Sequence, residues 1–313
     1  MLGFLLKRVL SVIPVMFVVA ALVFAVLRLT PGDPAAIIAG DGATDAQIDA
    51  IRVSMGLDKP VPQQFAIWMG HLAHGNLGTS LISGQSAVSL IADRLGPSVA
   101  LSLSTILLTI ILAIPIGILA AWNQGRFIDR LIMAGSVIGF SVPVFIIGYA
   151  LILVFSMRLN WFPVQGYATL SAGLWEFAKR LILPTIALST VYVALIARMT
   201  RTSIIEVMNE DFIRTARSKG MREVSVLLFH ALRNAAVPIV TVIGVSISML
   251  IGGVVVTESV FNIPGLGRLV VDAVLARDYP VIQALILLFA GLYVLINLLI
   301  DLSYTLIDPR IRY

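Results

Sequence analysis

Residues 99–122 read VALSLSTILLTIILAIPIGILAAW and contain no Asp, Glu, Lys or Arg. A helix of about 20 apolar residues crosses the hydrocarbon core of a bilayer, so this stretch is long enough to span one. The whole chain has the same character, because 59% of its 313 residues are hydrophobic and 12% are charged. Soluble domains carry about 25% charged residues. The composition therefore predicts an all-α integral membrane protein.

Five further stretches are nearly free of ionisable side chains, one before residues 99–122 and four after them. Together, the six stretches predict transmembrane helices at about residues 9–29, 99–122, 131–157, 181–199, 235–257 and 280–303. The first stretch is longer than the apolar part of a signal peptide and no clear cleavage site follows it, so we interpret it as an uncleaved anchor. Residues 1–313 are expected to form a single transmembrane domain.

The distribution of basic residues predicts how the chain is oriented. Six spans place both termini on the same side, and more than half of the 22 Lys and Arg residues lie on that side. Short cytoplasmic loops are enriched in Lys and Arg, so we expect cytoplasmic termini and a cytoplasmic loop at 201–233. The loop at 31–98 contains six aspartates and is then extracytoplasmic. This topology, rather than nucleic-acid binding, accounts for the formal charge of +5.

The loop at 31–98 contains two helix patterns. The sequence TDAQ at 44–47 is typical of a capping box, with Thr44 as the N-cap, Gln47 reaching back to it, and Gly56 ending the helix. A second helix is indicated by apolar residues repeating at i, i+3, i+4 and i+7, namely Phe65, Trp68, Met69 and Leu72. We expect this second helix to lie on the membrane surface or on a partner.

A compact charged segment, DFIRTARSKGMREV at 211–224, separates two long apolar runs. It predicts a short helix at about 212–219, with Asp211 as the N-cap and Gly220 in the left-handed conformation after the last turn. One interpretation is a charged cytoplasmic loop. The other is a docking element for a soluble protein, which would explain the four apolar residues among the charges: Phe212, Ile213, Ala216 and Met221.

Two pieces of this region, TARSKG at 215–220 and HALRNAAVP at 230–238, resemble the cytoplasmic loop of ABC importer permeases. Five others are similar to the dipeptide/oligopeptide/nickel branch of that family: RLTPGDP at 28–34, GNLGTS at 75–80, NIPGLGRL at 262–269, ARDYPVIQ at 276–283 and DPRIRY at 308–313. The matches run in order from the first predicted span to the last residue.

The resemblance implies the type I importer permease fold and a subunit of the bacterial inner membrane. It also implies four partners: a second, homologous permease, two cytoplasmic ATPases that bind ATP and Mg²⁺, and an extracytoplasmic substrate-binding protein. The short helix would be the coupling helix that contacts one ATPase. The residues implied in this contact are Asp211, Arg214, Thr215, Ala216, Arg217, Lys219, Gly220 and Met221.

One feature departs from the family pattern. The general loop signature has Glu-Ala-Ala before its glycine, and this chain has Arg214, Thr215 and Ala216 at the corresponding place. The polarity of the ATPase contact is therefore expected to differ. The implied cargo is a peptide or a related small solute, with glutathione, opines and nickel as alternatives.

The fifth predicted span carries small and polar residues that could line a translocation path: Ser246, Ser248, Gly252, Gly253, Thr257 and Glu258. Ser and Thr also bond to carbonyls of their own helix, and Gly also allows helices to pack closely. Glu258 is either a functional group near membrane depth or the partner of Arg268 or Arg277 in a salt bridge. In the third span, a GxxxG at Gly135 and Gly139 indicates helix packing, and Pro143 predicts a kink.

Several other functions are disfavoured by the sequence. No lysine is followed by Ser or Thr, so the chain has no Walker A motif, and the absence of cysteine excludes thiolate chemistry. His71 and His74 are i, i+3 with no carboxylate close in sequence, so we predict no metal site and no bound cofactor. A stand-alone secondary transporter or channel would carry charges within its spans. A membrane-embedded enzyme would need clustered catalytic groups, so we predict a transporter subunit.

Overall fold

The computed structural model describes residues 2–29, 34–39, 42–54 and 56–307. The sequence motifs at 30–33 and 308–313 lie outside the described residues. The described chain forms helices and turns with one isolated β-bridge, between Thr79 and Ser86. It divides into two units, Met1–Leu95 with Leu269–Val294, and Gly96–Arg268 with Leu295–Tyr313.

The first unit begins with α1 (Leu2–Leu29), followed by α2 (Pro34–Ala39), α3 (Asp45–Ser54) and α4 (Val61–Ala73). The Gln47 side chain accepts the backbone N–H of Thr44 at 2.9 Å, and Gly56 is left-handed with φ +66°, as the sequence predicted. The Thr44 hydroxyl bonds to the Gln47 side chain at 3.2 Å, so this half of the predicted capping box differs from the standard motif.

The amphipathic face of α4 packs against α1. The Phe65 ring lies 5.9 Å from that of Phe17 and 5.3 Å from that of Phe24, and the Trp68 ring lies 5.6 Å from Phe24. Aromatic rings at such distances and tilted orientations attract one another beyond the apolar area they bury. The predicted helix is confirmed. Two of its apolar residues contact α1 but no residue of α4 is buried, so the expected contact with a membrane surface or a partner stays a prediction.

A second buried contact in this unit joins the segment 75–86 to the turn before α14 (Tyr279–Ile307). The Ser80 hydroxyl and the Leu81 N–H, at 3.1 Å, both donate to the carboxylate of Asp278. Arg277 adopts φ +54°, and a Cβ on Gly78 would lie 3.2 Å from Pro280. The motifs GNLGTS and ARDYPVIQ therefore meet at a buried carboxylate.

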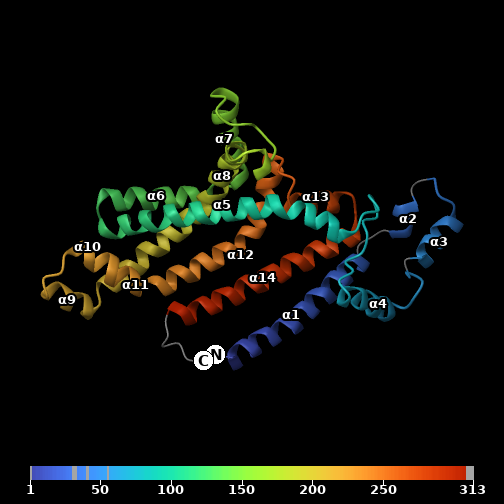
Figure 1. Cartoon of the computed structure of the whole chain (residues 1–313), viewed down its shortest axis with the longest axis horizontal. Coiled ribbons are helices and arrows are strands. Elements are labelled where there is room, and N and C mark those ends of the chain that lie inside the picture. Colours follow the sequence, from blue (N-terminus) through green and yellow to red (C-terminus); the bar gives the residue numbers. More distant parts are fainter. Residues whose placement is uncertain (1, 30–33, 40–41, 55, 308–313) are drawn as a thin grey trace. The chain divides into compact units, whose positions relative to one another are not determined.

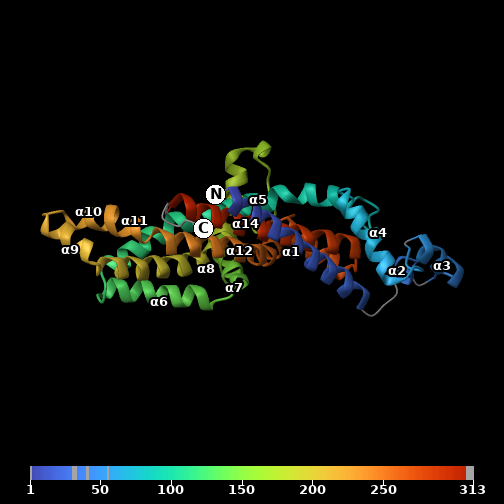
Figure 2. The ribbon, with the colours of Figure 1, turned by 90° about the horizontal axis from the view of Figure 1, so that it is seen from below.

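The second unit packs four long or broken helices around α8 (Leu174–Met208). These are α5 (Ala87–Trp122), α6 (Phe127–Ser141), α7 (Val144–Leu151), which continues into the π-helix η1 (Ile152–Arg158), and α12 (Ala236–Phe261). Both views show α6 running alongside α8 (Figures 1 and 2). A short 3-10 turn, η2 (Leu170–Ala172), precedes α8, and α13 (Leu266–Leu275) follows α12.

The two faces of α5 differ in how far their side chains are buried. Leu101, Thr105 and Thr109 are buried at i, i+4, i+8, and Leu103, Leu107 and Ile111 form an exposed stripe two residues along. An exposed row of large aliphatic side chains is costly in water and favourable in lipid. This pattern agrees with a helix that spans a bilayer.

Four described helices are long and apolar enough to cross a membrane: α5, α8, α12 and the Tyr279–Ser303 part of α14. The pair Phe127–Ser141 and Val144–Arg158 passes the same test only together, which allows a fifth span. In α1 the described apolar stretch, Leu10–Ala25, is shorter. The six predicted spans are therefore supported as four or five, and the sixth stays a prediction.

The third predicted span is broken at Pro143. Its two helices bend by 99°, which is sharper than the predicted kink. Val142 has extended backbone angles because the ring of the following proline disfavours a helical residue before it. Within the GxxxG, a Cβ on Gly139 would lie 3.3 Å from Thr190, whereas one on Gly135 would meet no described heavy atom within 4 Å. Among the described residues, Gly139 therefore lies at a close helix contact and Gly135 does not.

Candidate functional site: the α8–α12 connection and the C-terminal end of α12

The predicted short helix is α9 (Asp211–Ser218), and it lies beyond the end of α8 (Figure 1). It begins one residue earlier than predicted. Asp211 is its first residue and Glu210 is the N-cap, so the prediction of Asp211 as the N-cap is wrong. The Asp211 carboxylate instead pairs with Arg214 at 3.2 Å along the helix surface, a contact between i and i+3 that both side chains make while exposed.

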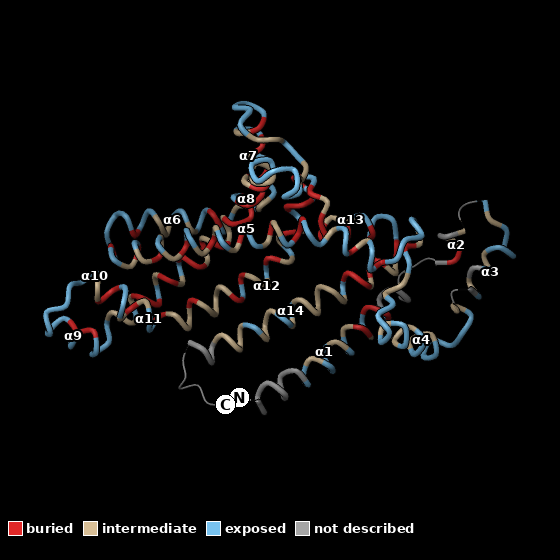
Figure 3. The backbone as a smooth tube through the Cα atoms, in the orientation of Figure 1, coloured by how far each residue is buried: buried red, intermediate tan, exposed pale blue. Residues whose placement is uncertain are grey.

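The apolar residues of α9 divide between two faces. Ile213 and Ala216 are buried in a cluster formed by the ends of the neighbouring helices, and Figure 3 shows the remainder of α9 as exposed. Phe212 and Met221 are exposed. The other members of the buried cluster are Ile204, Val226, Leu227, Ala231, Ala235 and Ile239. The cluster fixes α9 on the end of α8, on the π-helix η3 (Val226–Ala231) and on the start of α12, and leaves its other face open.

Gly220 ends α9 in the left-handed conformation, with φ +77°, as the sequence predicted. The Gly220 N–H donates to the Arg217 carbonyl at 2.9 Å, and the Met221 N–H donates to the Ala216 carbonyl at 3.4 Å. These two bonds form a Schellman motif, which satisfies the last carbonyls of the helix. A Cβ at Gly220 would meet no heavy atom of the described chain within 4 Å. Glycine is therefore required by the backbone angle and not by local space.

The remaining predicted contact residues lie on the exposed surface of the loop. Arg217 forms a forked ion pair with Glu223, with N···O distances of 2.8 and 3.2 Å. The Thr215 hydroxyl donates to the Asp211 carbonyl of its own helix at 3.1 Å. Lys219 caps the C-terminus of α9 and is exposed. The loop thus displays cationic and apolar side chains together.

The six predicted path residues on α12 lie in different environments. Ser246 and Thr257 are buried and donate to carbonyls of their own helix. A Cβ on Gly253 would lie 2.8 Å from Leu188 and from Tyr192, so Gly253 lies at a helix contact. The Ser248 hydroxyl is buried and finds no hydrogen-bond partner among the described residues. Gly252 is exposed.

An exposed stripe on α12 contains Gly252, which the sequence predicted as a path residue, and four residues that were not predicted. It consists of Val245, Met249, Gly252, Val256 and Ser259, which recur at three- or four-residue intervals along one face. Val245, Met249 and Val256 are apolar and larger, so a search for small and polar residues could not find them, whereas Ser259 fits that search. The signal that could have found them is the spacing of small and flexible residues on one helical face.

Glu258 is fully buried at the C-terminal end of α12, with 0% exposure. Its carboxylate accepts the hydroxyl of Ser98 at 2.5 Å and the backbone N–H of Arg268 at 3.0 Å. Ser98 accepts the backbone N–H of Leu266 at 2.7 Å. The structure therefore places the backbone N–H of Arg268 beside Glu258, and the salt bridge with the side chain of Arg268 or Arg277 stays a prediction.

The loop after α12 is shaped around this carboxylate. Asn262 ends α12 in the left-handed conformation, with φ +52°. A Cβ on Gly265 would overlap the Glu258 carboxylate, and one on Gly267 would lie 2.5 Å from the Cα of Val255. The two glycines of NIPGLGRL are therefore required because the chain passes directly over Glu258. We call Ser98, Glu258, Gly265, Gly267 and Arg268 the Glu258 knot.

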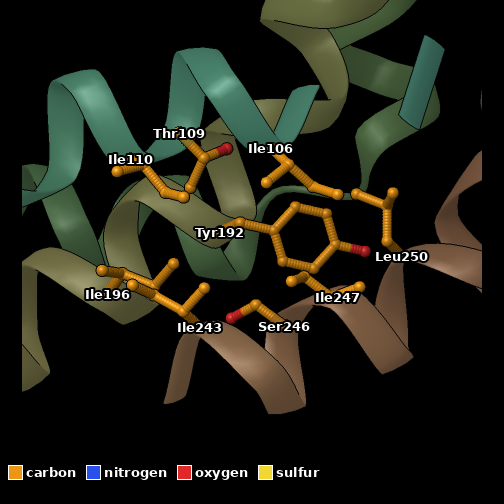
Figure 4. A pocket seen from close by; sticks show the side chains of 9 residues that line it. All are labelled: Ile106, Thr109, Ile110, Tyr192, Ile196, Ile243, Ser246, Ile247 and Leu250. Carbon is orange, nitrogen blue, oxygen red and sulfur yellow. The ribbon is translucent and has the colours of Figure 1, made fainter. Parts of the chain in front are cut away.

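A small pocket lies between α5, α8 and α12 (Figure 4). Its free volume is about 10 Å³, which holds a single water molecule at most. Its walls are mainly apolar, with Thr109, Tyr192 and Ser246 as the polar exceptions. This pocket is too small for a transported solute. Across the residues that the structure describes, no three His, Asp or Glu side chains come together as a metal site.

Comparison with known proteins identifies the family. Residues 113–313 match the family described as "Binding-protein-dependent transport system inner membrane component", and residues 1–104 match the N-terminal region of such components. A probable peptide ABC transporter permease of Sinorhizobium fredii is 51% identical over 99% of both chains. A putative peptide transport system permease of Brucella abortus is 45% identical, and the glutathione permease GsiC of Escherichia coli K12 is 44% identical, each over all of both chains.

The fold also has a solved counterpart. A chain of the MetNI methionine ABC transporter in an inward-facing conformation matches with a TM-score of 0.59 and 18% identity, over 71% of this chain and 97% of the other. With the apolar helices described above, these matches make the protein a multi-pass inner membrane protein and a transporter component rather than an enzyme. The chain belongs to the family of binding-protein-dependent transport system inner membrane components, and it is the permease subunit of an ABC importer.

Proposed function

We propose that this permease subunit forms half of the membrane path of an importer for peptides, and that α9 is the coupling helix through which a separate ATPase drives it. The main support for this proposal is the division of α9 into a buried and an exposed face. Two buried residues, Ile213 and Ala216, fix it to the end of α8, while Phe212, Met221 and its charged residues stay open to a partner.

Four further subunits complete the proposed importer. They are a second, homologous permease, two cytoplasmic ATPases that carry ATP and Mg²⁺, and an extracytoplasmic substrate-binding protein. The chain itself lacks a Walker A motif, which agrees with ATP hydrolysis on other subunits. The pocket between α5, α8 and α12 holds at most one water molecule and so is not the solute path, and we place that path between the two permeases.

Peptides are the favoured cargo because the relatives at 51% and 45% identity are named as peptide permeases. Glutathione, the cargo named for the relative at 44% identity, is itself a small peptide. Opines and nickel remain the alternatives. The encoded binding protein would decide between them, since ligand released from it after purification can be identified by mass spectrometry.

We further propose that both termini and α9 face the cytoplasm and that the loop at 31–98 is extracytoplasmic. The absence of cysteine allows a direct test with single cysteines. A cysteine at Gly42 should react with an impermeant thiol reagent in cells whose outer barrier is permeable. A cysteine at Ser218 should react only after the inner membrane is opened. The reverse pattern would overturn the orientation.

The function itself is tested in reconstituted vesicles. The purified chain alone should hydrolyse no ATP, and the complex with both ATPases and the second permease should hydrolyse ATP faster when the binding protein is added. Robust hydrolysis by the isolated chain would overturn the proposal. Uptake of solute by the chain alone under an ion gradient would indicate a secondary transporter instead.

A further inference from the structure

A partly buried ion pair joins α6 to α8 near the start of α6. Arg201 of α8 donates to Asp129 of α6 through two nitrogens, Nε to Oδ1 at 2.5 Å and Nη2 to Oδ2 at 2.7 Å. The backbone N–H of Gly125 also donates to Oδ2, at 2.8 Å. Asp129 is 3% exposed, whereas the Arg201 side chain is 24% exposed. Forked pairs of this kind fix the orientation of both groups as well as their distance.

The same two helices are also held together at a second point. Gly139 of α6 packs against Thr190 of α8 so closely that a Cβ would lie 3.3 Å from the Thr190 methyl group. The residues between the two points cover about 15 Å of each helix, at 1.5 Å per residue. Two attachments this far apart prevent α6 from pivoting on α8.

The ion pair lies close to α9 along the chain. Arg201 is about two turns before the end of α8, and α9 begins three residues after that end. At the same level a Cβ on Gly117 of α5 would lie 2.5 Å from Thr200, so α5 is also in tight contact there. At its other end α6 stops at Ser141, and the chain breaks at Pro143 and bends by 99° into α7.

We propose that Asp129 and Arg201 form a clamp that makes α6 follow α8 whenever a docked protein moves α9. The clamp residues are positioning residues, and the clamp lies on the side of α6 away from the break at Pro143. This inference rests on the proposed function in one respect, that α9 is where the driving protein docks. A buried ion pair is weak evidence for stability, and fixing a unique arrangement is a better-attested use of such pairs.

The clamp predicts a measurable rigidity between α6 and α8. Because the chain lacks cysteine, spin labels can be placed on Leu131→Cys of α6 and Glu206→Cys of α8, both of which are exposed. In the purified permease without ATPases, the distance distribution should be narrow. In Asp129→Asn, which keeps the size of the side chain, it should broaden or shift. A broad distribution in the unsubstituted chain, or no change in Asp129→Asn, would overturn the clamp.

The complete complex tests the consequence. With ATP, Mg²⁺ and vanadate, the α6–α8 distance should stay constant in the unsubstituted chain, and binding-protein-stimulated ATPase activity should fall about tenfold in Asp129→Asn, within the 5- to 150-fold range of typical couplings. Normal stimulation in Asp129→Asn would overturn the inference. Should that variant fail to assemble, Arg201→Lys keeps the charge, removes the fork and should show the same loss.

A matched control removes an exposed ion pair elsewhere. Asp49 pairs with Arg52 on the surface of α3, so Asp49→Asn should change neither the α6–α8 distance nor the stimulation. Failure of the proposed function can be told apart from failure of the clamp. If the proposed function is wrong, the binding protein will not stimulate ATPase activity of the unsubstituted complex. The α6–α8 distance measured without ATPases still tests the clamp in that case.

Discussion

The α8–α12 connection and the Glu258 knot use charged residues in opposite ways. In α9 and the segment after it, both ion pairs lie on the surface, Asp211 with Arg214 and Arg217 with Glu223. In the knot, a single carboxylate is wholly buried and receives a hydroxyl and a backbone N–H. Surface ion pairs contribute at most about 1 kcal/mol, whereas removing a donor from a buried charged group costs about 1–3 kcal/mol.

The difference separates a region held by buried contacts from one that, under the proposed function, meets another protein. In the Glu258 knot, the loop 262–268 is held by the hydrogen bonds of Ser98 and Glu258 and by the close approach of Gly265 and Gly267 to α12. The helix α9 is attached by only two buried side chains and presents its remaining residues outward. We therefore expect substitutions in the knot to lower stability and substitutions around α9 to lower coupling with little effect on stability.

The largest effect is expected for Gly267→Ala. The new Cβ would lie 2.5 Å from the Cα of Val255 and 2.9 Å from its backbone nitrogen, and backbone atoms cannot rotate away. The substitution should lower the free energy of unfolding by about 3 kcal/mol, measured by thermal unfolding in detergent. Gly96→Ala is the matched control, since a Cβ there meets no described heavy atom within 4 Å. Equal stability of both variants would show that the loop can move away from α12.

Removal of one donor from the knot should have a smaller effect. Ser98→Ala leaves the Glu258 carboxylate without its hydroxyl donor and leaves the N–H of Leu266 without its acceptor. We expect a loss of about 2 kcal/mol in the free energy of unfolding. Ser104→Ala is a suitable control on the same helix, because the Ser104 hydroxyl bonds to the Leu101 carbonyl and to Thr185 and is only partly buried. A loss in Ser98→Ala no larger than in the control would contradict the role of the knot.

At α9 the decisive substitution is Gly220→Val. A β-branched residue with positive φ costs about 1–2 kcal/mol or more, although no described atom obstructs the side chain. Membrane insertion and pairing with the second permease should be retained while ATP-driven uptake is lost. Gly220→Asn should keep most of the uptake, because Asn tolerates the left-handed conformation. Normal uptake by Gly220→Val would contradict the assignment of α9 as the coupling helix.

The smallest effect on stability is expected for Glu223→Gln, which breaks the pair with Arg217. Both side chains are largely exposed, so the free energy of unfolding should change by less than about 0.5 kcal/mol. A change in ATPase binding without a change in stability would agree with a contact surface. A large loss of stability would remove the contrast between the two regions.

The sequence predicted local structure well where a single residue decides it. The short helix, its glycine end and the α4 helix depend on caps and apolar spacing, which are local signals. The partner of Glu258 could not be predicted in full, because Ser98 lies 160 positions away and its role depends on how α5 meets α12. The sharp bend at Pro143 was underestimated, since proline signals a break but packing sets the angle.

The exposed stripe on α12 shows a second limit. The helix is apolar almost throughout, so hydrophobic periodicity says little about which face is covered. Polar residues were the natural guides, and three of them, Ser246, Thr257 and Glu258, are buried within the chain. Their hydroxyl and carboxylate groups are satisfied there, as buried polar groups generally are. Which face of α12 is exposed depends on the helices that pack against it, and the structure is needed to identify those helices.

The central claim, that a separate ATPase docks on α9, is tested most directly by thiol protection. A single cysteine at Ser218 is exposed at the end of α9, and one at Gly42 serves as the control far along the chain. In detergent-solubilised complexes, the reaction of Ser218→Cys with a thiol reagent should slow markedly when the ATPases are present, while that of Gly42→Cys should not change. Equal labelling of Ser218→Cys with and without the ATPases would contradict the claim.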